Sequence, residues 1–123
     1  MTFIENIYTE LKNNAITKNS EEFSTRFLRK SPHYYSAIKS QGREAHTSLL
    51  LDLAENLVTQ REALQAYDKS GLLESRWKKW SEIEEKVAQE VALRTTRRGK
   101  LHSGALNSVI FALQTVSNNH AAA

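Results

Sequence analysis

Residues 20–57 read SEEFSTRFLRKSPHYYSAIKSQGREAHTSLLLDLAENL and carry most of what this 123-residue chain reveals about its fold. Apolar side chains at positions 23, 27 and 28 recur at helical spacing after Ser20, a preferred N-cap residue that two acidic residues follow. Ser31-Pro32 predicts the start of a second helix, because serine suits the N-cap and proline suits the first helical position. The stretch therefore predicts two short helices separated by a tight break near Lys30.

The apolar positions that follow complete the pattern. Tyr35 and Ile38 are expected to face inward from the second helix, which Gln41-Gly42 should end. A third, longer helix is expected to begin with Thr47 or Ser48 as its cap. Its predicted inward residues are Leu49, Leu50, Leu53, Ala54, Leu57 and Val58.

The segments outside this stretch also read as helices. Thr2 and Glu5 form a predicted capping box for a helix that ends at Asn13-Asn14, and Ile16 is expected to enter the core. On the C-terminal side, apolar residues three or four positions apart predict one helix of about 24 residues. That stripe consists of Leu73, Trp77, Trp80, Ile83, Val87 and Val91. A last helix is expected from Ser103, with Leu106, Val109, Ile110, Leu113 and Val116 on its apolar face.

Composition agrees with an all-α chain of about six helices. There are four Gly and one Pro, which argues against a sandwich or barrel, and the absence of Cys excludes disulfides and cysteine-ligated zinc. No apolar run is long enough to span a membrane, and the N-terminus does not resemble a secretory signal, so a cytoplasmic location is expected. We predict a first domain over residues 1–70 and a C-terminal helical unit over 71–123.

Two interpretations of the C-terminal unit remain open. Its stripe is either core, covered by the last helix, or a dimerisation element, because a lone helical hairpin buries too little surface to be stable. The dimer-interface candidates are Trp77, Trp80, Val87 and Val91.

The net charge is only +3, but the charges are clustered. Between Phe23 and Arg43 there is no acidic residue, and the basic ones are Arg26, Arg29, Lys30, Lys39 and Arg43. A second basic patch without acids follows residue 91 and consists of Arg94, Arg97, Arg98 and Lys100. Such patches attract polyanions, although short charge runs are often only solvated surface.

The stretch at 20–57 resembles the helix-turn-helix of the lambda-repressor-like (Cro/C1, XRE-type) DNA-binding family. The resemblance rests on the apolar-small pair Phe23-Ser24, on Phe27-Leu28, on the serine-started helix with Tyr35 and Ile38, and on the S-x-x-x-L-x-x-L-A-x-x-L pattern that follows. The family usually has glycine in the inter-helix turn, where this chain has Leu28 or Arg29, and the glutamine pair that often opens the recognition helix is absent. The resemblance therefore implies the fold but leaves the DNA sequence open.

The resemblance implies a small bacterial or phage-type transcription regulator that binds double-stranded DNA as a homodimer through a recognition helix at Ser31–Ser40. The implied base-contact candidates are Ser31, His33, Tyr34, Ser36 and Lys39. The implied phosphate-contact candidates are Arg26, Arg29, Lys30 and Arg43.

Two alternatives stay open: a helical adaptor of the anti-activator or antitoxin type that binds protein, and a nonspecific nucleoid-type DNA binder. An enzyme is not indicated, because the four His show no metal-ligand spacing and there is no Gly-rich phosphate loop or nucleophile elbow. We predict no catalytic residue, metal or cofactor, and we expect the acidic residues at helix caps and exposed faces.

Overall fold

The computed structural model describes residues 1–97, and within them it contains five α-helices, one π-helical turn and no strand. The elements are α1 (Phe3–Asn13), α2 (Ser20–Glu22) continuing into the π-helical turn η1 (Phe23–Phe27), α3 (Tyr34–Ser40), α4 (Thr47–Gln65) and α5 (Glu74–Arg97). The all-α prediction is confirmed. The helix predicted from Ser103, with Arg98 and Lys100 before it, lies outside the described residues. No described helix is long and apolar enough to cross a membrane.

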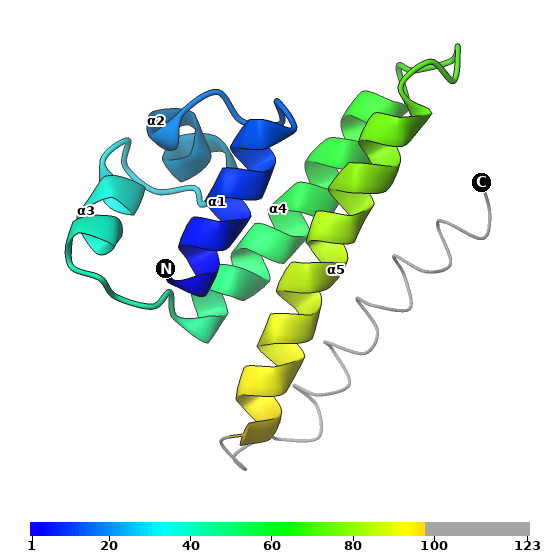
Figure 1. Cartoon of the computed structure of the whole chain (residues 1–123). Coiled ribbons are helices and arrows are strands. Elements are labelled where there is room, and N and C mark those ends of the chain that lie inside the picture. The colour runs from blue at the N-terminus through cyan, green and yellow to red at the C-terminus, as the bar shows by residue number, and fades with distance from the viewer. Residues whose placement is uncertain (98–123) are drawn as a thin grey trace.

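The long helices α4 and α5 pack side by side and antiparallel, and the N-terminal helices lie along this pair, with α3 at the edge away from α5 (Figure 1). One hydrophobic core is formed by residues of α1, η1, α3, α4 and α5, from Ile4 in α1 to Val91 in α5. Trp80 lies at its centre, fully buried, and its indole Nε1–H donates to the Leu57 carbonyl oxygen at 3.0 Å. The predicted domain boundary near residue 70 falls between α4 and α5, and the core spans it.

The stripe on α5 belongs to this core. Trp77, Trp80, Val87 and Val91 are all buried, and α5 packs on α1 and α4. The interpretation of this stripe as a dimer interface is therefore corrected, because the side chains it needs are covered within one chain.

The helix starts differ from the sequence prediction at three places. The capping box of α1 is confirmed, with the Glu5 N–H donating to Thr2 Oγ1 at 3.3 Å and the Thr2 N–H donating to the Glu5 carboxylate at 2.7 Å. The cap of α2 is Asn19 rather than Ser20, since Asn19 Oδ1 accepts from the Glu22 N–H at 2.9 Å. The other two differences concern α3 and α4, which begin at Tyr34 and Thr47 after the residues His33 and His46, neither of which caps through its side chain.

Candidate nucleic-acid interface

Helix α3 has one buried face and one exposed face. Tyr35 and Ile38 point into the core, as predicted. Burial, with smaller effects from the neighbouring Glu5 and Tyr8, raises the pKa of the Tyr35 phenol to about 12, so this ring is a neutral core residue at physiological pH. The side chains of Ser36 and Lys39 lie on the exposed face. The amphipathic pattern therefore leaves a polar face of α3 toward solvent.

The start of α3 is set by a buried hydroxyl on the preceding helix. Ser24 is fully buried, and its Oγ donates to the Ser20 carbonyl oxygen at 2.9 Å and accepts from the Tyr35 N–H at 3.0 Å. One small side chain thus satisfies a free N–H in the first turn of α3. This contact links η1 to α3 at the position where the sequence places a small residue.

This contact also explains why Ser31-Pro32 does not begin the helix. Ser31 and Pro32 form a turn in which the Tyr34 N–H donates to the Ser31 carbonyl oxygen at 3.1 Å. Proline's fixed φ suits such a turn as well as a first helical position. The predicted base-contact residues Ser31 and His33 therefore lie before α3, both exposed, while Tyr34 opens the helix and is half-buried.

The turn between η1 and α3 contains a strained residue. The Leu28 N–H donates to the Phe23 carbonyl oxygen, and the Lys30 N–H donates to that of Ser24, which closes the turn around Arg29. Arg29 has φ +54°, in the left-handed region that favours glycine. The left-handed conformation that glycine adopts most easily is therefore held here by an arginine.

We predict that Arg29→Gly is more stable than Arg29→Ala by about 1 kcal/mol, because both remove the same side chain but only glycine relieves the left-handed backbone. Urea unfolding followed by tryptophan fluorescence measures the difference. Equal stability of the two variants would show that the backbone at this residue is not strained.

Two amides of α4 hold the end of the π-helical turn. Asn56 Nδ2 donates to the Phe27 carbonyl oxygen at 2.6 Å, and Gln60 Nε2 donates to the Arg26 carbonyl oxygen at 2.8 Å. These carbonyls belong to the last turn of the element and have no partner within it. The sequence analysis did not single out these residues. Their signal is a pair of amides four residues apart on or beside the apolar face of α4.

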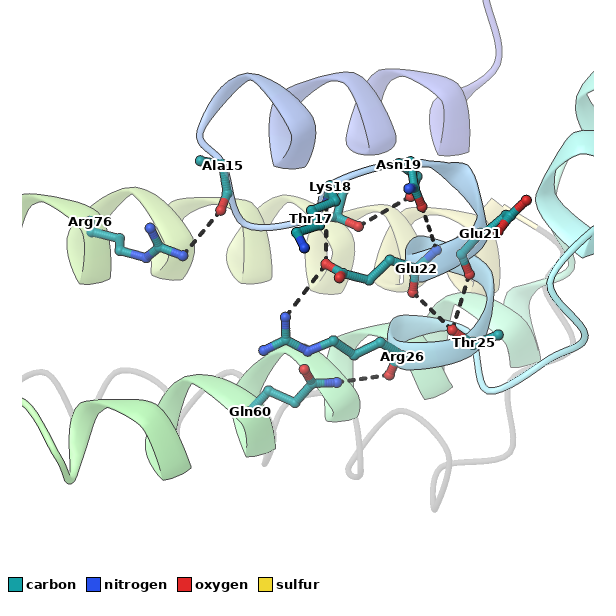
Figure 2. Close-up of polar contacts among 10 residues, drawn as sticks. All are labelled: Ala15, Thr17, Lys18, Asn19, Glu21, Glu22, Thr25, Arg26, Gln60 and Arg76. Atoms are coloured by element: carbon teal, nitrogen blue, oxygen red, sulfur yellow. Dashed lines mark hydrogen bonds and ion pairs between the residues drawn. The ribbon is translucent and has the colours of Figure 1, made fainter.

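The predicted phosphate contacts differ in their surroundings. Arg26 is engaged locally, because its guanidinium lies 3.6 Å from the Glu22 carboxylate (Figure 2). It also lies 5.0 Å from the centre of the Phe27 ring. Arg29, Lys30 and Arg43 are exposed, and Lys30 Nζ lies 5.7 Å from the centre of the Tyr34 ring. Within residues 1–97, no ion pair joins these three residues or Lys39 to an acid. The surface around α3 therefore keeps its positive charge.

The pKa of Glu5, on α1, responds to this positive charge. The pKa of the Glu5 carboxyl is lowered, first by the backbone and hydroxyl hydrogen bonds from Thr2 and to a smaller extent by positive charge that includes Lys39. The Glu5 carboxylate is bonded to Thr2 in the capping box, which holds it at the start of α1.

Arg94, the first residue of the predicted second basic patch, is bonded to other groups of this chain. Its guanidinium donates to the carbonyl oxygen of Ala45 and lies 3.0 Å from the Glu44 carboxylate and 3.6 Å from the Glu90 carboxylate. The side chain of Arg97, together with Arg98 and Lys100, lies outside the described part of the chain. Arg94 is therefore a contact between α5 and the loop before α4.

Comparison with known proteins gives one family. A model described as a family of unknown function, DUF6626, matches residues 4–100, a span that reaches from α1 through α5. Neither a curated protein nor a solved structure matches the chain.

Proposed function

We propose that this chain, which belongs to the DUF6626 family, is a small transcription regulator that binds duplex DNA with α3 in the major groove. The observation that carries the proposal is the exposed basic face formed by α3 and the turns at its two ends, within a segment from Phe23 to Arg43 that has no acidic residue. A short helix with its apolar face in the core, preceded by a helix and a tight turn, has the layout of a helix-turn-helix reader. The resemblance seen in the sequence and the geometry of α3 support the same interpretation.

Among the base-contact candidates, three are exposed on α3 or just before it. Ser36 and Lys39 lie on the exposed face of α3, where side chains enter the groove. The lysine ammonium suits the O6 and N7 acceptors of guanine, and the serine hydroxyl suits several base edges. His33 lies exposed just before the first turn, so it is a third candidate, whereas the half-buried Tyr34 ring is shared with the core.

Phosphate contact is assigned to the two ends of α3. Arg29 and Lys30 lie before the helix, and Arg43 lies after it. Cations at both ends of a recognition helix would bind the backbones that border the major groove, and such contacts provide affinity and salt dependence rather than sequence choice.

The test begins with a random-sequence duplex library, from which the best-bound sequence is selected. We predict that Lys39→Ala or Ser36→Ala weakens binding to the selected sequence by about 1–3 kcal/mol while changing its binding to unrelated duplexes much less. Lys30→Ala or Arg43→Ala should weaken binding to all duplexes alike and lower the salt dependence. Lys78→Ala, which removes an exposed cation from α5, is the control and should bind normally.

Two outcomes contradict the specific-reader proposal. If all variants around α3 lose affinity equally for every duplex, the chain is a nonspecific nucleoid-type binder. If the wild-type chain shows no salt-dependent binding to DNA at all, the DNA-binding proposal fails.

The proposal includes a homodimer, because readers of this class bind two half-sites related by symmetry. The dimer must use a surface other than the buried α5 stripe. Light scattering with and without the selected duplex measures the stoichiometry. A cytoplasmic location belongs to the same proposal, since a transcription regulator must reach DNA.

A second candidate function is supported by a different surface. In the loop between α4 and α5, Tyr67 is 87% exposed and Leu72 is 84% exposed, and the next residue, Leu73, is partly exposed. Neighbouring exposed apolar side chains are typical of protein contacts. They favour the adaptor alternative, in which the chain binds a protein through this loop and shows no salt-dependent affinity for DNA.

A further inference from the structure

The loop between α3 and α4 connects the proposed DNA-binding surface to the rest of the molecule. Its first part is closed by the end of α3, where the Gly42 N–H donates to the Lys39 carbonyl oxygen at 3.0 Å and the Arg43 N–H donates to that of Ile38 at 3.1 Å. Gly42 has φ +62°, which allows this tight reversal. After Arg43 the chain must still reach the start of α4 at Thr47.

A side chain from α5 holds this second part of the loop. Arg94 lies 49 residues beyond Ala45, and its guanidinium donates to the Ala45 carbonyl oxygen. The same guanidinium bonds the Glu44 carboxylate at 3.0 Å and lies 6.0 Å from the centre of the Phe3 ring at the start of α1. Ala45 itself is buried in the core. Arg94 thus joins α5, the α3–α4 loop and α1 at one point.

The contacts of Arg94 differ in their expected strength. Glu44 is mostly exposed, so water screens that ion pair and it contributes little by itself. The side chain of Arg94 is only 17% exposed, and the hydrogen bond from its charged guanidinium to a backbone carbonyl is of the stronger kind. The ion pair with Glu90, one turn earlier on α5, orients the guanidinium toward the loop.

We propose that Arg94 is a positioning residue for the surface around α3: it fixes the second part of the loop, at Glu44 and Ala45, and so holds α3 and the turn that carries Arg43 in place relative to α4 and α5. The effect on DNA rests on the proposed function, whereas the effect on the loop does not. It follows that α5 is part of the binding unit, although it lies outside the helix-turn-helix.

Limited digestion of the intact protein with trypsin tests the loop directly, because trypsin cleaves after Arg43. We expect Arg94→Ala to accelerate cleavage after Arg43 about tenfold, while cleavage after Lys79 within α5 stays at the wild-type rate. An increase at Arg43 alone reports local opening, and an equal increase at both sites reports global unfolding. Arg94→Lys, which keeps the charge but not the forked donors, should give a smaller increase.

Lys86→Ala is the matched control. It removes another ion pair of α5, the one with Glu10 of α1, but no contact to the loop. It should leave cleavage after Arg43 unchanged. On the DNA side, Arg94→Ala should weaken binding to all duplexes about as much as Arg43→Ala does, and Lys86→Ala should have a smaller effect.

The proposal is overturned if trypsin cleaves the Arg94→Ala variant after Arg43 at the wild-type rate. It is also overturned if the substitution accelerates cleavage after Arg43 and after Lys79 equally. If the loop opens selectively and the wild-type chain does not bind DNA, the positioning of the loop stands and the proposed function fails. The two failures are therefore distinguished by separate measurements on the same variants.

Discussion

Arg61→Met should lower the free energy of unfolding by about 3–5 kcal/mol, because it removes the guanidinium that pairs with the buried Glu84 carboxylate. The Arg61 side chain is 5% exposed and that of Glu84 is 1% exposed. They form a two-point contact between α4 and α5, with Nε–Oε2 at 2.6 Å and Nη2–Oε1 at 3.2 Å, and Arg61 Nη1 also donates to Gln65 Oε1 at 2.9 Å. Urea unfolding followed by tryptophan fluorescence and circular dichroism measures the loss.

The double variant Arg61→Met with Glu84→Leu is the matched control. It removes both charges and keeps the volume close to that of the original side chains, so it should recover most of the stability and is expected to unfold near the wild-type midpoint. A double variant as unstable as the single one would mean that packing, not an unpaired charge, accounts for the loss. Lys79→Ala, which breaks an exposed pair with Glu82 on the same helix, should cost less than about 0.5 kcal/mol.

Ser24→Val should have a comparably large effect, a loss of about 2–6 kcal/mol. Valine cannot accept the buried Tyr35 N–H, and an unsatisfied buried donor costs about 1–3 kcal/mol. Its extra methyl group must also fit into a fully buried position between two helices, which costs a further ~1–3 kcal/mol. Unfolding by urea gives the total loss.

Ser24→Ala separates the two terms, since it removes the acceptor without adding volume. Thr25→Val is the control on the neighbouring exposed position, whose hydroxyl donates only within its own helix, to the Glu21 carbonyl oxygen at 3.0 Å. It should change the free energy of unfolding by about 0.5 kcal/mol or less. If Ser24→Val and Thr25→Val are equally stable, the Ser24 hydroxyl does not fix the start of α3.

Apolar spacing predicted the parts of the fold that depend on periodicity. Tyr35, Ile38 and Ile16 are buried as expected, and so is the stripe on α5 from Trp77 to Val91. The prediction for Leu73 was wrong, because this residue precedes α5 and is 46% exposed. A period of 3.6 residues is a property of one segment, so it is visible without knowing what the segment packs against.

Helix starts were predicted less well, because several residues at each start satisfy the same local rule. Asn19 and Ser20 are both good N-cap residues, and only the structure shows that Asn19 bonds the Glu22 N–H. At α3 the choice depends on Ser24, which is eleven residues away from the N–H that it binds. Such a long-range contact leaves no pattern in the local sequence.

The buried charges were not predicted at all. Acidic residues were expected at caps and exposed faces, and Glu84 contradicts this, because it lies among the buried residues of α5. Its spacing does separate it from the exposed Glu82 and Glu85, because Glu84 lies four residues after Trp80 and three before Val87, on the face of the buried stripe. Arg61 and Glu84 lie 23 positions apart, and only the packing of α4 on α5 brings them together. Among the site residues, Asn56 and Gln60 were missed for the same reason.

The buried pair between α4 and α5 has a consequence for how this fold can be divided. Many small domains can be cut out and fused to other proteins as independent cassettes. A cassette ending at residue 70 would lose Trp80 from the centre of the core and would strip Arg61 of its counter-ion. The transplantable unit therefore includes α5, and recombination that preserves this fold must exchange α1 through α5 as a single block.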